Sequence, residues 1–195
     1  ILGNRLIELL SLDKKNKVFL LDHNKNFKRL NKTNFKNKIN FIGGDFVNLN
    51  KVKSLIKKHK FKVIFHLGAV TQVIDAYKSP LKTFKTNIDG TINILEAIRL
   101  INKKIIFIYA SSDKAYGEYS QRDLPYKESY DLRPLYPYDV SKAAADMITK
   151  SYASEGPIHC STKYDLSKVS VTKRERLTSG SLGFNLSTTL WMPFG

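Results

Sequence analysis

The sequence predicts an α/β protein with a doubly wound parallel sheet. Two patterns in its 195 residues support this fold class: short, nearly continuous apolar runs, and stretches of helical periodicity that alternate with them. Apolar runs of this kind are typical of strands that are covered on both faces. The chain is long enough for one domain with a core of its own.

The first expected element is an amphipathic helix over residues 1–12, with Arg5 and Glu8 among its apolar residues. It lacks the basic start, apolar middle and cleavage site of a signal peptide. Strands are then expected in four places. They are residues 17–22 (KVFLLD), 39–42 (INFI), 63–67 (VIFHL) and 105–109 (IIFIY).

Three further helices are expected between and after these strands. Asn50 caps the first, Ser79-Pro80 opens the second, and the third covers residues 138–154; proline suits a first helical position. Apolar residues at helical spacing define the expected buried faces. They are Val52, Leu55, Ile56 and His59 in the first; Leu81, Phe84, Ile88, Ile92 and Leu95 in the second; and Val140, Ala144, Met147, Ile148 and Tyr152 in the third.

The pattern changes near Gly156. Residues 158–190 are rich in Ser and Thr, contain the charged run KRER at 173–176, and predict neither a regular strand nor a helix. We therefore expect one domain over residues 1–156 and an unassigned segment, loop-rich or non-native, over residues 157–195.

The strongest chemical signal is the pair Tyr138 and Lys142. Residues at this spacing lie one turn apart on the same face of a helix. A buried ammonium beside a phenol stabilises the phenolate and lowers the tyrosine pKa from about 10. The pair therefore predicts a general base that can take the proton of a hydroxyl group near neutral pH.

A second signal follows the strand at 105–109. This strand continues directly into Ser111, Ser112, Asp113 and Lys114. The carboxyl ends of parallel strands face the crevice in which ligands bind in open α/β sheets. Hydroxyl, carboxylate and amine groups are thus expected at the mouth of such a crevice, close to the Tyr–Lys helix.

Together these motifs resemble the extended short-chain dehydrogenase/reductase family, in its NAD-dependent epimerase/dehydratase branch. The matching pieces are VFLLD, GGDF, VIFHLGAVT, NIDGTINILEA, YASSDKAYGE and PYDVSK, in the family's order and spacing. The resemblance covers about residues 1–156 and implies a Rossmann-like domain that binds NAD. It also implies a nucleotide-sugar substrate, oxidised at C4 with Tyr138 as base and with Ser112 hydrogen-bonded to the 4-oxygen.

The resemblance assigns cofactor roles along the chain. Gly3 matches the last glycine of the family's Gly-rich turn, and Asp22 matches the acid that holds the adenosine ribose, which favours NAD over NADP. The residues with other implied cofactor contacts are Asp45, Phe46, Leu67, Gly68, Ala69, Thr71 and Asn87, together with Tyr138 and Lys142. Asn87 matches a helix asparagine that bridges to a cofactor-side loop; otherwise it is a buried amide that satisfies backbone groups.

Asp113 and Lys114 bear on the reaction that follows oxidation. Many 4,6-dehydratases of the family have Asp-Glu here, with Asp as acid and Glu as base, whereas simple 4-epimerases have small or hydroxyl residues. Asp-Lys resembles the CDP-glucose 4,6-dehydratase type, in which the lysine serves as base or neutralises Asp113. The sequence thus favours a dehydratase, with a 4-epimerase as the alternative. A catalytically silent NAD-binding or scaffolding fragment is the alternative from another class.

Two family features are missing from the sequence. The chain starts at the third glycine, and neither the family's first strand nor its C-terminal substrate domain is recognisable. In this fold the first strand is central to the sheet. We therefore expect a truncated sheet in which the neighbouring strands lack ladder partners.

The formal charge of +16 raises the question of a nucleic-acid partner. Residues 1–62 carry +12 and residues 63–195 carry +4, with lysine spread over helix faces and loops. This spread favours a solvated lysine surface, so neither a nucleic-acid partner nor a membrane is expected. The single Cys160 favours a reducing cytoplasm. The resemblance also implies a homodimer.

The four histidines suggest no metal site. His23, His59 and His159 have no ligand-like spacing to one another or to Cys160. His66 lies within an apolar strand and is expected to be a core histidine with a hydrogen-bond partner.

Overall fold

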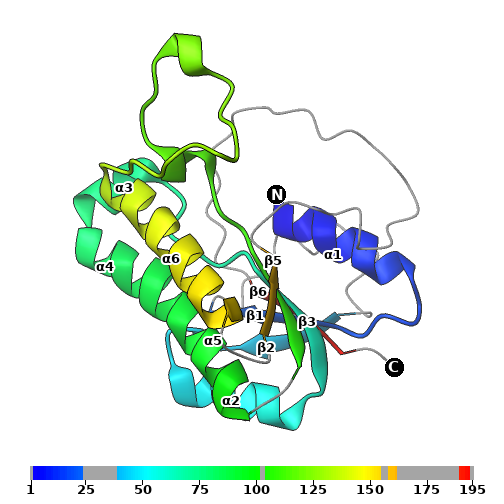
Figure 1. Cartoon of the computed structure of the whole chain (residues 1–195). Coiled ribbons are helices and arrows are strands. Elements are labelled where there is room, and N and C mark those ends of the chain that lie inside the picture. The colour runs from blue at the N-terminus through cyan, green and yellow to red at the C-terminus, as the bar shows by residue number, and fades with distance from the viewer. Residues whose placement is uncertain (1, 24–38, 102–103, 155–157, 162–188, 194–195) are drawn as a thin grey trace.

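The computed structural model describes residues 2–23, 39–101, 104–154, 158–161 and 189–193, and shows the expected α/β fold (Figure 1). The helices are α1 (Leu2–Leu12), α2 (Leu49–Lys58), α3 (Val73–Lys78), α4 (Pro80–Phe84), the π-helix η3 (Lys85–Asp89), α5 (Gly90–Ile101), the 3₁₀ turns η4 (Asp113–Tyr116) and η5 (Gln121–Asp123), and α6 (Pro137–Ser154). The strands are β1 (Val18–Asp22), β2 (Ile39–Gly43), β3 (Phe61–His66), β4 (Ile105–Tyr109), β5 (Ile158–Ser161) and β6 (Thr189–Pro193). The fold class and the four predicted strands are confirmed.

These strands form one sheet in the order β2-β1-β6-β3-β4-β5. β1 pairs with β2, β3 with β4, and β4 with β5, all in parallel. β6 runs antiparallel to both of its neighbours, β1 and β3. The carboxyl ends of β1, β3 and β4 therefore lie at the same edge of the sheet.

β5 and β6 correct two of the expectations. We expect a loop-rich or non-native segment over residues 157–195, yet two strands from this segment join the sheet. We also expect β1 and β3 to lack partners at the position of the family's first strand. Instead β6 pairs with both, because an antiparallel strand satisfies the same backbone donors and acceptors as a parallel one. The rest of that segment, including the run at 173–176, lies outside the described residues.

Apolar side chains fill both faces of the sheet. Alternate residues of a strand point to opposite faces, so Val18 and Leu20 pack with Ile7 and Leu10 of α1. On the other face Phe19 and Leu21 join a larger core that includes α2 and α5. Figure 1 shows α1 on one side of the sheet and α2, α5 and α6 on the other.

The second predicted helix is interrupted. Pro80 begins α4 as expected, but a π-turn over Lys85–Asp89 separates it from α5. The first predicted helix also begins earlier than expected. Asn48, not Asn50, caps α2, since its Oδ1 accepts from the backbone N–H of Lys51 at 3.0 Å.

The predicted buried faces of the second and third helices are partly wrong. Leu81 is 77% exposed and Met147 is 61% exposed. The buried positions of η3 and α6 next to the sheet are mostly small or polar: Asn87, Ser141, Lys142, Ala145 and Thr149. Apolar periodicity misplaced these faces because polar groups occupy this part of the interior.

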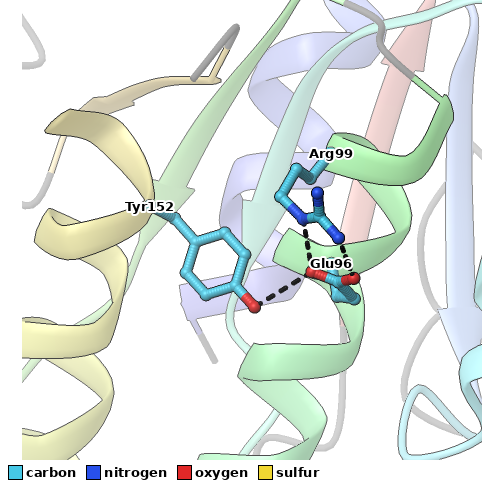
Figure 2. Close-up of polar contacts among 3 residues, drawn as sticks. All are labelled: Glu96, Arg99 and Tyr152. Carbon is cyan, nitrogen blue, oxygen red and sulfur yellow. Dashed lines mark hydrogen bonds and ion pairs between the residues drawn. The ribbon is translucent and has the colours of Figure 1, made fainter. Parts of the chain in front are cut away.

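Helices α5 and α6 are also joined by a polar cluster near their C-terminal ends (Figure 2). Arg99 donates two hydrogen bonds to Glu96, at 2.8 and 2.6 Å, and the Tyr152 hydroxyl donates to Glu96 Oε2 at 3.1 Å. The Arg99 hydrogen bond is the main reason that the Glu96 pKa lies below its usual value. This cluster links the two helices that stand next to the site.

Candidate active site

Tyr138 and Lys142 lie in the first two turns of α6 and are both buried. Tyr138 is 9% exposed and Lys142 is 4% exposed. Pro137 begins the helix and has no backbone N–H to leave unpaired, which suits it to this position. The helix therefore holds the phenol and the amine one turn apart on its buried side.

The amine of Lys142 reaches the carboxyl end of β4. Its Nζ donates to the carbonyl oxygen of Ala110 at 2.5 Å and lies 4.6 Å from the centroid of the Tyr109 ring. Burial lowers the pKa of Lys142 to about 8, and the Asp146 carboxylate opposes that shift. The predicted meeting of α6 with the segment after β4 is thus present.

The residues after Ala110 form the turn η4, against which α6 packs. The Ser112 hydroxyl caps this turn: it accepts from the backbone N–H of Lys114 at 3.2 Å and donates to Asp113 Oδ1 at 3.1 Å. Asp113 and Lys114 are exposed. All three predicted catalytic residues of this segment therefore lie on the turn beside α6, with Ser112 half-buried.

Asp139 is a carboxyl group that sequence reasoning missed. It follows Tyr138 and is only 5% exposed. Burial raises its pKa, while the positive charge of Lys114 acts in the opposite direction, and the negative charges of Asp113 and Glu118 raise it further. Its position beside Tyr138, the predicted catalytic tyrosine, is the available sequence signal.

Asn87 links three parts of the site. Its side chain accepts from the Val70 backbone N–H at 2.7 Å and donates to the Val70 carbonyl at 3.1 Å. It also donates to Ser141 Oγ at 2.8 Å, and that hydroxyl donates to the Tyr138 carbonyl at 2.7 Å. The loop after β3, the π-turn and the start of α6 are therefore joined by buried hydrogen bonds.

The same network extends to His66 through Thr91. Thr91 Oγ1 donates to the Asn87 carbonyl at 2.6 Å and lies 3.1 Å from His66 Nε2. Burial, together with the positive charge of Lys142, lowers the His66 pKa to about 3. His66 is thus a neutral core histidine with a hydrogen-bond partner, as predicted.

The predicted cofactor residues lie mainly at the carboxyl edge of the sheet. Asp22 ends β1 and His23 Nδ1 lies 3.6 Å from its Oδ1, while Leu67, Gly68 and Ala69 follow β3 and are buried. Thr71 is half-buried in the same loop, and Gly3 is buried in the first turn of α1. These placements bring β1, β3 and α1 to one edge.

Asp45 and Phe46 follow β2 and differ from each other in exposure. Asp45 is exposed and its Oδ1 accepts from the Val47 backbone N–H at 2.9 Å. The Phe46 ring is buried and packs edge-on against the ring of His66, 5.1 Å between centroids. Its side chain therefore belongs to the core, and Asp45 offers the polar group at this position.

Tyr109, Ser141 and Thr91 were also missed by sequence reasoning. The sequence pattern indicates Tyr109 only as the end of a strand, although it immediately precedes the residue whose carbonyl accepts from Lys142. Thr91 and Ser141 lie four and three residues after Asn87 and Tyr138, so helical spacing carried the signal for both.

Two further findings bear on the kind of site. No group of three or more His, Cys, Asp and Glu suited to a metal ion occurs among the described residues. None of the helices in the described ranges is long and apolar enough to cross a membrane.

Fold and site together define a class: a Rossmann-like domain of the extended short-chain dehydrogenase/reductase type with a Tyr–Lys pair. The sequence also matches the family model of GDP-mannose 4,6 dehydratase over residues 2–179. The chain belongs to this family of nucleotide-sugar dehydratases and epimerases.

Individual relatives support the same assignment. CDP-paratose 2-epimerase of Salmonella typhi is 35% identical over 127 residues, 58% of this chain and 38% of that protein. CDP-glucose 4,6-dehydratase of Salmonella typhimurium is 27% identical over 109 residues, 56% of this chain and 30% of that protein. The crystal structure of Thermus thermophilus UDP-glucose 4-epimerase in complex with NAD has a TM-score of 0.71 and 25% identity, over 82% of this chain and 50% of that one. The chain spans half or less of the length of each.

Proposed function

We propose that the protein oxidises C4 of a nucleotide-linked hexose with NAD, eliminates water across C5 and C6, and returns the hydride to C6 and a proton to C5, as a nucleotide-sugar 4,6-dehydratase. The observation that carries the proposal is the buried Lys142 amine at the carboxyl end of β4, one helical turn from the buried phenol of Tyr138. A buried ammonium beside a phenol stabilises the phenolate, which can then abstract a proton. Burying this charge lowers the stability of the folded protein, so a role in catalysis gives a reason for its position.

The residues present fit NAD. Asp22 ends β1 with a carboxylate suited to ribose hydroxyls, and Gly68 and Ala69 leave room for a backbone to approach a ligand. With Gly3 in the first turn of α1, a helix N-terminus near this edge suits a pyrophosphate. Asp45, Thr71, Asn87 and Lys142 complete the proposed set. When bound, NAD supplies the hydride acceptor for the oxidation.

Tyr138 acts as the base for the 4-hydroxyl proton. Lys142 favours the phenolate because its ammonium is buried one helical turn away on the same side of α6. The Ser112 hydroxyl donates a hydrogen bond to the 4-oxygen of the sugar. To do so it rotates away from Asp113 Oδ1, to which it donates in the structure. Residues 1–156 carry all of these groups, and we propose that they form the NAD-binding unit.

Dehydration requires an acid and a base after oxidation. We assign the acid to Asp113, which protonates the departing 6-hydroxyl so that it leaves as water. Lys114 takes the C5 proton, and the charges of Asp113 and Lys114 both reach Asp139 on α6. The exposed position of both residues on η4, beside the Tyr–Lys helix, supports these roles.

A second candidate is 4-epimerisation without dehydration. The similarity to the Thermus thermophilus UDP-glucose 4-epimerase favours it. A catalytically silent NAD-binding protein is the third candidate, and the presence of Ser112, Tyr138 and Lys142 argues against it.

The setting of the reaction is also a proposal. We propose a homodimer in a reducing cytoplasm that serves polysaccharide synthesis and has no nucleic-acid or membrane partner. The single cysteine supports the reducing setting, and the spread of lysine over helix faces and loops supports the absence of a nucleic-acid partner.

Product analysis tests the reaction. Purified protein is incubated with NAD and with CDP-, UDP-, GDP- or dTDP-glucose, and the products are separated and identified by NMR. We expect a 4-keto-6-deoxy sugar from one of them, and none from Tyr138→Phe. A 4-epimer as the product selects the second candidate; NAD binding without any product selects the silent one.

A further inference from the structure

The nearest partners of the Lys142 ammonium carry no full charge. Its Nζ contacts the Ala110 carbonyl and the face of the Tyr109 ring, and among the residues that the structure describes it makes no ion pair. Asp146 is the carboxylate that acts on it, yet Asp146 itself pairs with Lys150 at 2.7 Å. The cation therefore lies in a buried position without a counter-ion of its own.

The Tyr109 side chain is as deeply buried as that of Lys142. Tyr109 is 4% exposed at the end of β4, and its ring also packs against His66, 5.9 Å between centroids. His66 stays neutral near pH 7, because its pKa lies at about 3, so it contributes no charge repulsion there. The ring of Tyr109 is thus held in place beneath the amine by the strand and by its neighbours.

We propose that Tyr109 is a positioning residue whose ring face holds the Lys142 side chain in its charged form beside Tyr138. An aromatic face attracts a cation through its quadrupole, and this attraction is largest where water is excluded. The ring and the Ala110 carbonyl together replace part of the hydration that Lys142 loses on burial. The role in catalysis rests on the proposed function, whereas the effect on the amine does not.

Two matched substitutions separate the ring from the hydroxyl. Tyr109→Phe keeps the aromatic face, and Tyr109→Leu keeps an apolar side chain without one. The pKa of Lys142 is followed in the full chain by NMR of lysine labelled at Cε and Nζ, with the Lys142 signal assigned by its absence from Lys142→Met. The other groups that act nearby, Asp146 and His66, remain in both variants.

The expected results differ between the two variants. Tyr109→Phe leaves the Lys142 pKa where it is, and Tyr109→Leu lowers it by about one pH unit. An unchanged pKa in Tyr109→Leu overturns the proposal, as does an equal fall in both variants.

A third variant covers the case in which Tyr109→Leu does not fold. Trifluorophenylalanine at position 109 keeps the shape of the ring and withdraws its electron density. The Lys142 pKa must then fall relative to Tyr109→Phe, and equal values in these two proteins overturn the proposal. Because the titration needs neither NAD nor sugar, a normal result with an inactive protein contradicts the proposed function alone.

Discussion

Two parts of the protein interior differ in the polarity of their buried side chains. Between α2, α5 and the sheet the buried residues are apolar and fully enclosed, with Val52, Ile56, Ile94 and Ile98 each 0% exposed. Between η3, α6 and the carboxyl end of the sheet, a region we call the polar seam, the buried residues are Asn87, Thr91, Ser141, Lys142 and His66. Both parts are equally closed to water.

The difference shows how polar side chains of the candidate site can be buried. Each polar side chain in the seam has a partner within the described part of the chain: Asn87 with Val70 and Ser141, and Thr91 with His66. Burying such groups without partners costs free energy, whereas hydrogen-bonded groups fix one arrangement. The apolar core thus supplies stability, and the seam fixes the position of the amine.

The largest expected loss of stability is in the apolar core. Ile94→Ala removes a fully buried side chain and should cost about 2–5 kcal/mol of unfolding free energy. Urea unfolding of the two proteins measures the loss. A cost below that of any seam substitution would contradict the division of roles between the two regions.

The seam should respond in the opposite direction at Lys142. Its pKa of about 8 in the folded protein lies below the ordinary 10.5, so burial of the charge costs stability at neutral pH. Lys142→Met should therefore raise the unfolding free energy at pH 7 by about 1–3 kcal/mol. The gain should shrink as the pH rises from 8 to 10.5, because the lysine is then neutral in the folded state. A less stable Lys142→Met protein at pH 7 would show that its contacts outweigh its burial.

His66 predicts a pH dependence of stability on the acid side. Its pKa is about 3 in the folded protein and near 6.5 when unfolded, so the unfolded state binds the extra proton between these values. Stability from this group is present above pH 6.5 and is lost as the pH falls towards 3, by about 1.4 kcal/mol per pH unit. His66→Gln, which does not titrate, should show a shallower slope in urea unfolding from pH 6.5 to 4. Identical slopes would mean that His66 is protonated without unfolding.

The smallest effect is expected where a polar contact lies near the surface. Tyr152→Phe removes the hydrogen bond to Glu96 between α5 and α6 (Figure 2) and should cost about 0.5–1 kcal/mol. Thermal unfolding measures it. Tyr130→Phe, which removes a hydroxyl bond to the Asp123 carbonyl in an exposed loop, is the matched control. A cost above that of Ile94→Ala would remove the distinction between core and surface.

Sequence patterns predicted one of these regions better than the other. The four strands and the helix over Val52, Leu55 and Ile56 were found because apolar periodicity and burial coincide there. In α6 the same rule selected Met147, which is exposed, because the buried side carries Ser141 and Lys142. The polar residues of the seam can be buried because their hydrogen bonds are satisfied. A hydrophobic pattern does not detect such residues.

The candidate site was also predictable only in part. Motif spacing located Tyr138, Lys142 and Ser112, since each is fixed by its local helix or turn. The proposed role of Tyr109 depends on a contact between β4 and α6. The formation of β6 depends on pairing with strands that lie far from it in the sequence. Such long-range contacts have no local signature.

The central claim is that the pair Tyr138 and Lys142 removes the 4-hydroxyl proton while the C4–H bond breaks. Its most direct test is the single-turnover rate of oxidation of the nucleotide-glucose that the product assay selects, with hydrogen or deuterium at C4, by the parent protein and by Tyr138→Phe in the presence of NAD. We predict a slower reaction of the deuterated sugar, and a loss of about 10²–10⁴-fold in Tyr138→Phe. Equal rates for both sugars, together with full activity of Tyr138→Phe, would contradict the account.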